Sequence, residues 1–272
     1  MKKCLIFLIL SVILLSACTP AATPTVAGET APTQTTSVTL KVFAPSTMTE
    51  AAKALGAAFE AANPGVTVTF EIGHSPTQRL QFTQGATGDV FITAAKKDMD
   101  DAITDQSIES GKEALIARNK LVVILPPNNP AGIETLEDLV KDGVKLLVAN
   151  AETPIGKVTL TVLDKLAGKF GEDYKAKFTA NVVSQEAGVK PIVSKIKLSE
   201  ADAGIVFISD LAAATELKSI EIPAELNVIS QLYAAPLAKA TNPEQAAAFA
   251  AFVASPEGQA ILQKWGFLAP KE

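Results

Sequence analysis

From Val38 onward, short stretches of β-forming residues alternate with alanine-rich stretches that have the spacing of helices. The segment at residues 66–72 places its apolar residues at every second position, which is the pattern of a half-buried strand. Four further runs are continuously apolar, as the buried strands of parallel sheets are. They span residues 90–92, 121–125, 146–149 and 204–208. This alternation predicts an α/β fold in which mostly parallel sheets are flanked by helices.

The helical stretches show apolar stripes and clear start signals. Ala51, Leu55, Ala58 and Phe59 follow amphipathic spacing. A second stripe has the same character and is predicted to end at Gly168; it consists of Val158, Val162, Leu163 and Leu166. Near the C-terminus, two capping residues are each followed by proline, which predicts helices that start there and end near Ala254 and Trp265; the pairs are Asn242-Pro243 and Ser255-Pro256.

Two strand-to-helix junctions in the first third of the chain end in hydroxyl residues. The patterns Thr47-x-x-Glu50 and Ser75-x-x-Gln78 both predict capping boxes, and Pro76 suits a first helical position. The start of a helix presents free N–H groups and the positive end of the helix dipole, which suits an anion. Ordinary helix capping explains most such boxes, so one box alone does not predict a ligand.

Two more junctions follow in the middle third. Thr153 is a predicted cap with Pro154 just inside the helix, and Gly188 precedes Val189 where backbone could approach a ligand closely. Ligands of open α/β sheets bind beyond the carboxyl ends of the strands. If the chain forms two lobes with two junctions in each, the four junctions would face one cleft and offer N–H and hydroxyl donors to a small anion.

The N-terminus has the pattern of a secretory signal. Lys2 and Lys3 precede an apolar run that is too short for a stable membrane span, and small residues lead to Cys18. This ending resembles a bacterial lipobox, which implies removal of residues 1–17 and acylation of Cys18; a signal peptide that merely contains a cysteine is the alternative. The predicted location is extracytoplasmic, with the chain anchored to the membrane through lipidated Cys18. Residues 18–37, rich in Thr, Pro and Ala, are predicted to be a tether.

Charge and cysteine content exclude several classes of function. Loss of residues 1–17 removes Cys4, Lys2 and Lys3, which leaves one cysteine and changes the formal net charge from −5 to −7. An acidic domain without a basic stripe does not suit nucleic acid, and one cysteine cannot form an intramolecular disulfide or a cysteine-based zinc site. The only arginines, Arg79 and Arg118, are far apart in sequence, so no guanidinium cluster is expected.

The length of the folded part suggests one large domain or two small ones. A chain that leaves one lobe, builds a second and returns would cross between them twice. Proline-containing strand exits at Leu125-Pro126 and Ala235-Pro236 are the candidate crossings. We therefore predict lobe 1 over residues 38–124 plus 232–272 and lobe 2 over residues 125–231.

Five segments resemble the molybdate-binding proteins of bacterial ABC importers. They are V-F-A-P-S-T-M-T-E from Val42, G-D-V-F-I-T-A-A from Gly88, N-x-L-V-V from Asn119, E-A-D-A-G-I-V-F from Glu200 and S-P-E-G-Q-A-I-L from Ser255. The resemblance extends from Val38 to Phe267. It implies the two-lobed type II fold of periplasmic binding proteins, with the ligand cleft between the lobes.

The resemblance also implies a set of ligand-binding residues. Carried over by position, the hydroxyl donors are Thr47, with Ser46 beside it, and Ser75. The backbone donors are Ile155 and Val189, where the alignment near Val189 is ambiguous by one residue. The last ligand of the family is a Tyr hydroxyl, and this chain has Phe207 there, which has no hydroxyl to donate.

The implied function is the capture of molybdate, or of nearly isosteric tungstate, and its delivery to an ABC permease by a monomeric binding protein. No cofactor and no direct metal-ion ligand are expected besides the oxyanion. Phe207 keeps open a protein of the same fold that binds sulfate, phosphate or a small organic anion.

An enzyme is not expected. A hydrolase using Ser75 or Ser46 with His74 is disfavoured, because no Gly-x-Ser-x-Gly elbow is present and His74 adjoins Ser75. The acidic residues Asp98, Asp100 and Asp101 lack the spacing of a calcium loop and are interpreted as a solvated helix face.

Overall fold

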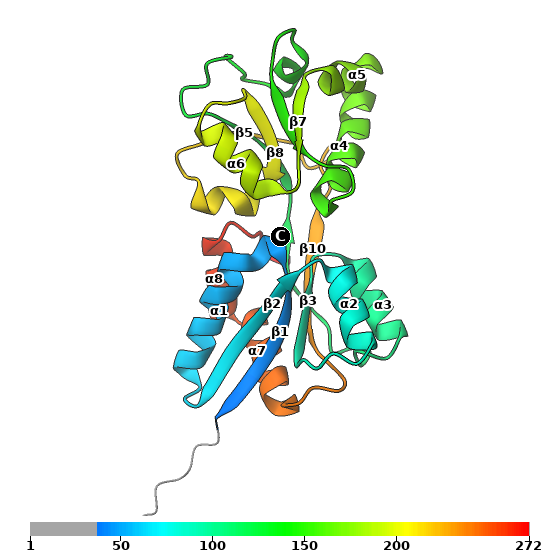
Figure 1. The fold of residues 1–272 in the computed structure, drawn as a ribbon, viewed down its shortest axis with the longest axis vertical. Helices are drawn as coiled ribbons and strands as arrows, with labels where there is room; N and C mark the ends of the chain where they lie inside the picture. The colour runs from blue at the N-terminus through cyan, green and yellow to red at the C-terminus, as the bar shows by residue number, and fades with distance from the viewer. Residues whose placement is uncertain (1–36, 272) are drawn as a thin grey trace, which may run out of the picture. The chain divides into compact units, whose positions relative to one another are not determined.

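The computed structural model describes residues 37–271, which form two five-stranded sheets with helices packed against them (Figure 1). The predicted α/β class and two-lobed fold are confirmed. The predicted signal peptide, Cys18 lipid site and tether lie outside the described residues, apart from residue 37.

The first sheet has the strand order β2-β1-β3-β10-β4. Strand β1 pairs in parallel with β2 and β3, and β10 pairs antiparallel with β3 and β4. The strands are β1 (Val38–Pro45), β2 (Val66–Gly73), β3 (Val90–Thr93), β4 (Ala114–Asn119) and β10 (Ser230–Pro236). The 3-10 turn η1 (Ser46–Met48) follows β1, and the helices are α1 (Thr49–Ala62), α2 (Ser75–Thr83), α3 (Lys96–Thr104), α7 (Pro243–Ala254) and α8 (Pro256–Lys264).

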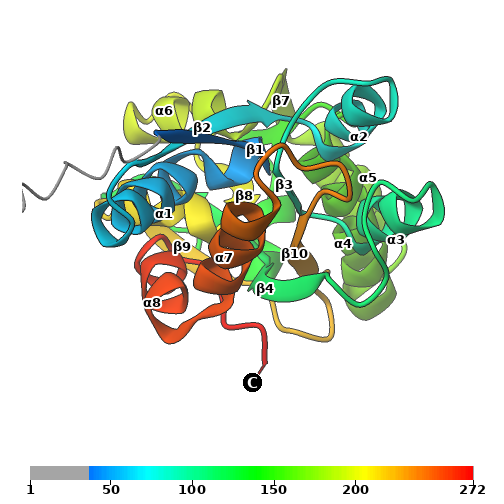
Figure 2. The same ribbon diagram turned by 90° about the horizontal axis from the view of Figure 1, so that it is seen from below.

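Alternation along β1 buries side chains on both faces of this sheet. Val42 packs in one apolar cluster with Phe59 of α1 and Phe249 of α7, whose rings meet edge to face. Phe43 points to the other face and packs with Met99 of α3. Figure 2 shows α1, α7 and α8 grouped together and α2 beside α3. At their carboxyl ends, β1, β2 and β3 each lead into the start of a helix.

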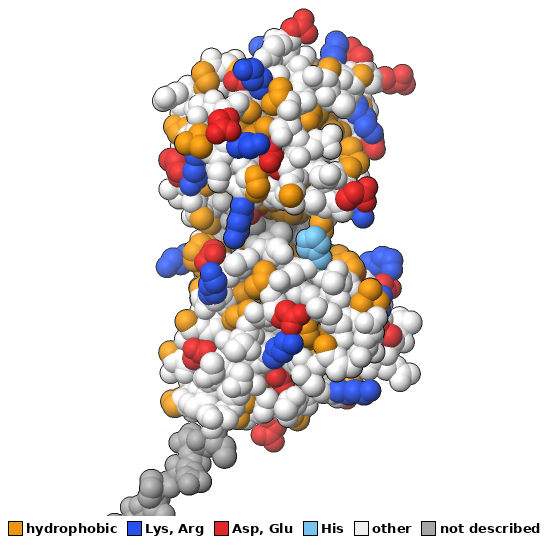
Figure 3. Space-filling model, viewed as in Figure 1, with side chains coloured by type: hydrophobic (Ala, Val, Ile, Leu, Met, Phe, Trp, Pro, Cys, Tyr) orange, Lys and Arg blue, Asp and Glu red, His pale blue; other side chains and the backbone are white. Residues whose placement is uncertain are grey.

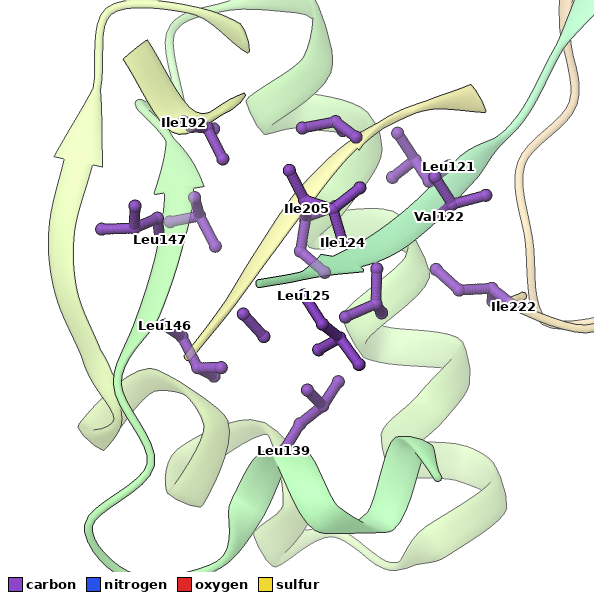
Figure 4. Close-up of a cluster of buried hydrophobic side chains, with 14 of the residues drawn as sticks. Leu121, Val122, Ile124, Leu125, Leu139, Leu146, Leu147, Ile192, Ile205 and Ile222 are labelled. Carbon is purple, nitrogen blue, oxygen red and sulfur yellow. The ribbon is translucent and has the colours of Figure 1, made fainter. Parts of the chain in front are cut away.

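The second sheet has the order β7-β6-β8-β5-β9. Its core is built from Leu, Ile and Val of these strands and of the covering helices, some of which Figure 4 labels. The strands are β5 (Leu121–Leu125), β6 (Leu146–Ala149), β7 (Val182–Glu186), β8 (Ala203–Phe207) and β9 (Lys218–Glu221). The helices are α4 (Pro154–Phe170), α5 (Asp173–Ala180) and α6 (Val189–Lys197), with 3-10 turns η2 (Leu136–Val140) and η3 (Ile208–Ala213).

Three features differ from the sequence prediction. The sheets are mixed, because β10 in the first and β5 in the second run antiparallel to their neighbours. Strand β5 belongs to the second sheet, so the chain crosses at Lys120 and the predicted crossing at Leu125 is wrong. Gly168 lies inside α4, which ends at Phe170, and the next residue, Gly171, has a positive φ (111°) that glycine adopts readily.

The two crossings lie side by side. Asn119 at the end of β4 pairs with Ser230 at the start of β10, so the outgoing and returning chains are neighbours in one ladder. The predicted return at Ala235-Pro236 is also displaced, since those residues are inside β10. At the second sheet, buried Asn227 fastens the crossings: its Oδ1 accepts from the N–H of Leu121 (3.1 Å) and Val228 (2.9 Å), and its Nδ2 donates to the Leu121 carbonyl (2.8 Å).

Candidate functional site

The junction after β1 does not form the predicted capping box. The 3-10 turn η1 intervenes, so α1 begins at Thr49 and Thr47 lies too early in the chain to cap it. Glu50 instead pairs with Lys53, and the Ser46 hydroxyl donates to the Gly73 carbonyl (3.2 Å). Thr47 Oγ1 is left buried without a hydrogen-bond partner. A buried polar atom of this kind is uncommon and calls for an explanation.

The junction after β2 also differs from the prediction. Helix α2 begins at Ser75 with Pro76 in its first turn, as predicted, and Ser75 is buried. Gln78 does not close a box with Ser75. Its Nε2 donates to the carbonyls of Glu71 (2.6 Å) and Ala44 (3.1 Å), because the amide lies beneath the ends of β2 and β1. Gln78 therefore fixes the first turn of α2 against the sheet.

The third junction follows the prediction and the fourth follows it in part. The Thr153 side chain accepts from the Gly156 N–H (3.1 Å), with Pro154 opening α4, and Ile155 is buried in that first turn. Helix α6 starts at Val189 after an extended Gly188. A Cβ at Gly188 would meet no atom within 4 Å, so this backbone is open to its surroundings.

Two cavities meet at Thr47. One, of about 270 Å³, is lined by η1 and α1 of the first lobe and by α6 and η3 of the second; it includes Ser46, Thr47, Val189, Lys190, Ser209 and Asp210. The other, of about 350 Å³, lies toward the crossings and includes Thr47, Asn119, Pro154 and Phe207. In Figure 3 the surface is hollowed between the two lobes, where side chains of both signs and His74 are exposed.

The structure gathers part of the predicted site. Ser46, Thr47 and Val189 line the first cavity, and Phe207 lines the second beside Thr47. Ser75 and Ile155 line neither cavity, although each lies at a helix start. Phe207 is buried, and its backbone N–H donates to Asp210 Oδ2 (3.1 Å).

Ser209 was missed by sequence reasoning. The residue is 8% exposed, and its Oγ accepts from Asn119 Nδ2 (2.9 Å) across the crossing. The available signal was its position two residues after Phe207, at the end of the same strand motif. The contact with Asn119 depends on how the strands cross, and no local pattern encodes it.

Asp210 and Lys190 bring charge to the first cavity. Burial raises the pKa of the Asp210 carboxyl to about 7, while the Phe207 N–H and nearby Lys190 act in the opposite direction. Glu50 lines the same cavity from the first lobe. The cavity therefore combines neutral hydroxyls with one lysine and two carboxyl groups, and one of these carboxyls is partly protonated near neutral pH.

No group of three potential metal ligands from His, Cys, Asp and Glu occurs among residues 37–271. Asp100 pairs with Lys96 (2.6 Å) and Asp101 with Lys97 (2.8 Å) along α3, as a solvated helix face does. Within that same range, no helix is both long and apolar enough to cross a bilayer.

Comparisons with known proteins show which family and fold the chain shares. Residues 40–268 match the model of a family described as bacterial extracellular solute-binding proteins. The molybdate-binding protein ModA of Mycobacterium tuberculosis is 31% identical over 230 residues, which cover 84% of each chain. YvgL of Bacillus subtilis, whose name describes a substrate-binding lipoprotein of an ABC transporter, is 23% identical and covers 85% of this chain and 87% of its own. A substrate-binding domain from Clostridium difficile, assigned to a molybdenum ABC transporter, superposes with a TM-score of 0.74 at 26% identity and covers 86% of this chain and 99% of its own.

Proposed function

This chain belongs to the bacterial extracellular solute-binding proteins, and we propose that it captures molybdate, and also tungstate, between its two lobes. The observation that carries this proposal is the Thr47 hydroxyl, which is buried without a partner where the two cavities meet. A buried donor without an acceptor costs about 1–3 kcal/mol of stability. A ligand oxygen that accepts from Thr47 would offset this cost. The similarity to a molybdate-binding relative supports the choice of anion.

The donor chemistry supports a fully deprotonated tetrahedral anion. Hydroxyls such as Thr47, together with N–H groups at the starts of α1, α4 and α6, donate hydrogen bonds and bring no full positive charge. Such donors favour an oxyanion that only accepts hydrogen bonds; the acceptors in the same cavity are the carboxyl groups of Glu50 and Asp210, and Asp210 cannot accept through its protonated oxygen when it is neutral. The proposed role is binding without catalysis and without a cofactor.

We further propose that the mature chain is held at the membrane through Cys18 and passes its anion to an ABC permease as a monomer. The lipobox pattern supports the anchor, and the name of the relative YvgL supports both the anchor and the transporter. Closure of the lobes about the paired crossings would bury the anion and give the permease one shape to recognise. The full sequence with its N-terminal segment is therefore the appropriate material for transport measurements.

Phe207 supports an alternative ligand in place of molybdate. Phe207 supplies no hydroxyl beside Thr47, so the donor set differs from that of the family, and sulfate, phosphate or a small organic anion is the alternative ligand. The fold and mechanism of capture would be the same.

A ligand panel tests the proposal. We expect molybdate and tungstate to raise the melting temperature of the full-length chain in detergent, and sulfate and phosphate at equal concentration to leave it unchanged, because binding to the folded state stabilises it. Calorimetry then gives the dissociation constants. A shift with sulfate and none with molybdate would overturn the assignment of the anion.

The Thr47→Val variant removes the hydroxyl and keeps the shape of the side chain. We expect its molybdate affinity to fall about tenfold or more, because a hydrogen bond to a charged group contributes about 1.5–3 kcal/mol. Thr161→Val, on an exposed turn of α4, is the matched control and should bind like the wild type. Equal affinity of both variants would remove Thr47 from the site.

A further inference from the structure

We propose that Ser209 donates its hydroxyl to the bound anion and replaces the donor that position 207 lacks. This inference rests on the proposed function, since it names a residue of the same site. Ser209 lies in η3, directly after β8, and lines the first cavity together with Thr47 and Val189.

The hydrogen bonds around Ser209 leave its proton unused. A serine hydroxyl has one proton to donate and two lone pairs that accept. Asn119 Nδ2 donates to the Ser209 oxygen (2.9 Å), and Asn119 Oδ1 accepts from the Lys120 N–H (3.1 Å), which fixes the direction of the amide. No other hydrogen bond of the Ser209 hydroxyl occurs among residues 37–271.

Each lobe thus offers one hydroxyl group to the cavity. Thr47 from the first lobe and Ser209 from the second are both largely shielded from water, and each has a hydroxyl proton without an acceptor. Both line one cavity. An anion in this cavity would accept from each lobe at once, which is the arrangement that favours a closed state.

Phe207 explains why a donor from η3 is needed. Its ring lines the second cavity, where a family Tyr would carry a hydroxyl, and it presents only carbon there. Ser209 follows two residues later and reaches the first cavity instead. Both positions flank Thr47, where the two cavities meet, so a hydroxyl at either position is expected to reach an anion bound beside Thr47.

The test is calorimetry of molybdate binding by the full-length chain and its variants. Ser209→Ala should weaken binding about tenfold or more, and Ser209→Thr should keep most of the affinity. Phe207→Tyr in the Ser209→Ala background should restore affinity. Ser219→Ala, on exposed β9 of the same sheet, is the matched control.

The outcomes separate the two proposals. If the wild type binds no oxyanion, the proposed function fails and this inference with it. If the wild type binds molybdate and Ser209→Ala binds equally well, the role of Ser209 is overturned and the proposed function stands. If Ser209→Ala loses affinity and Phe207→Tyr does not restore it, Ser209 serves the crossing through Asn119 and the donor role is overturned, because a purely structural role does not respond to a hydroxyl at 207.

Discussion

Asp210 places a titratable carboxyl within the cavity that also holds Thr47 and Ser209. Burial keeps the protonated form favoured up to about pH 7, and the charged groups that face it in the cavity are Lys190 of α6 and Glu50 of α1. A charged Asp210 would repel an anion, whereas a protonated one does not. The charge of Asp210 therefore influences stability and, under the proposed function, would also influence anion capture.

The pKa of Asp210 gives a pH prediction with a definite sign. The folded chain holds this proton to about pH 7, while the unfolded chain releases it near pH 4, so stability falls as pH rises between these values and changes little above them. We expect the wild type to lose up to about 1.4 kcal/mol per pH unit relative to Asp210→Asn in that interval. Urea unfolding from pH 4 to 8 measures this.

The exposed variant Asp142→Asn controls for the loss of one negative charge and should follow the wild type. Parallel pH profiles of the wild type and Asp210→Asn would show that burial does not raise the pKa of this carboxyl.

Single residues differ in how well the sequence predicts them. The positions of Ser46, Thr47 and Val189 at helix starts follow from local pattern, and the structure places them in one cavity. Ser209 could not be found this way, because its environment depends on Asn119, which is distant in sequence. Ser75 and Ile155 stay predictions, since neither lines a cavity in this structure.

The elements that shape the site are the turns from strand to helix. The predicted caps Thr153 and Ser255 are confirmed, since each accepts from an N–H three residues later. The two predicted capping boxes are wrong for reasons that lie outside the local pattern. A 3-10 turn displaces the start of α1, and the Gln78 amide donates to backbone carbonyls near the ends of β1 and β2.

A substitution at Gly156 tests how closely the first turn of α4 approaches the preceding loop. A Cβ there would lie 2.0 Å from the Asn150 carbonyl oxygen, which is backbone and cannot move aside. Gly156→Ala should therefore lower the free energy of unfolding by about 1–3 kcal/mol, as overpacking does, and should displace the first turn of α4.

Gly168→Ala is the matched control in the same helix, because a Cβ at Gly168 would meet no atom within 4 Å. It should stabilise the chain by about 0.5–1 kcal/mol, since alanine favours a helix interior over glycine. Thermal or urea unfolding of both variants decides the matter, and equal stability of the two would contradict the close approach at Gly156.

At the scale of the whole molecule, the class and the family were predictable and the strand partners were not. Alternating strands and helices predict the α/β class, and the match over residues 40–268 confirms the family resemblance. The predicted placement of residues 121–124 in lobe 1 is wrong, because an apolar strand is buried equally well in either sheet. Only the pairing of β5 with β8 and β9 decides the matter.

Asn227 provides a test of how the crossings are held. Asn227→Ala removes hydrogen bonds from the buried backbone of Leu121 on both its N–H and its carbonyl. We expect the free energy of unfolding to fall by about 2–4 kcal/mol, because buried backbone groups lose their partners. Asn128→Ala, at an exposed loop position, should cost less than 0.5 kcal/mol. Equal urea midpoints would mean that Asn227 does not fasten the crossings.

The neighbouring crossings also limit how the molecule can move. The two crossing strands are paired where they leave the first sheet, with Asn119 beside Ser230. We expect such a pair to bend more easily than either lobe can twist about it. If the lobes open and close as proposed, this pairing would restrict the motion to bending about the crossings. Under the proposed function, substitutions in the cleft would change which anion is held, while the path of closure, and hence the shape presented to the permease, would stay the same.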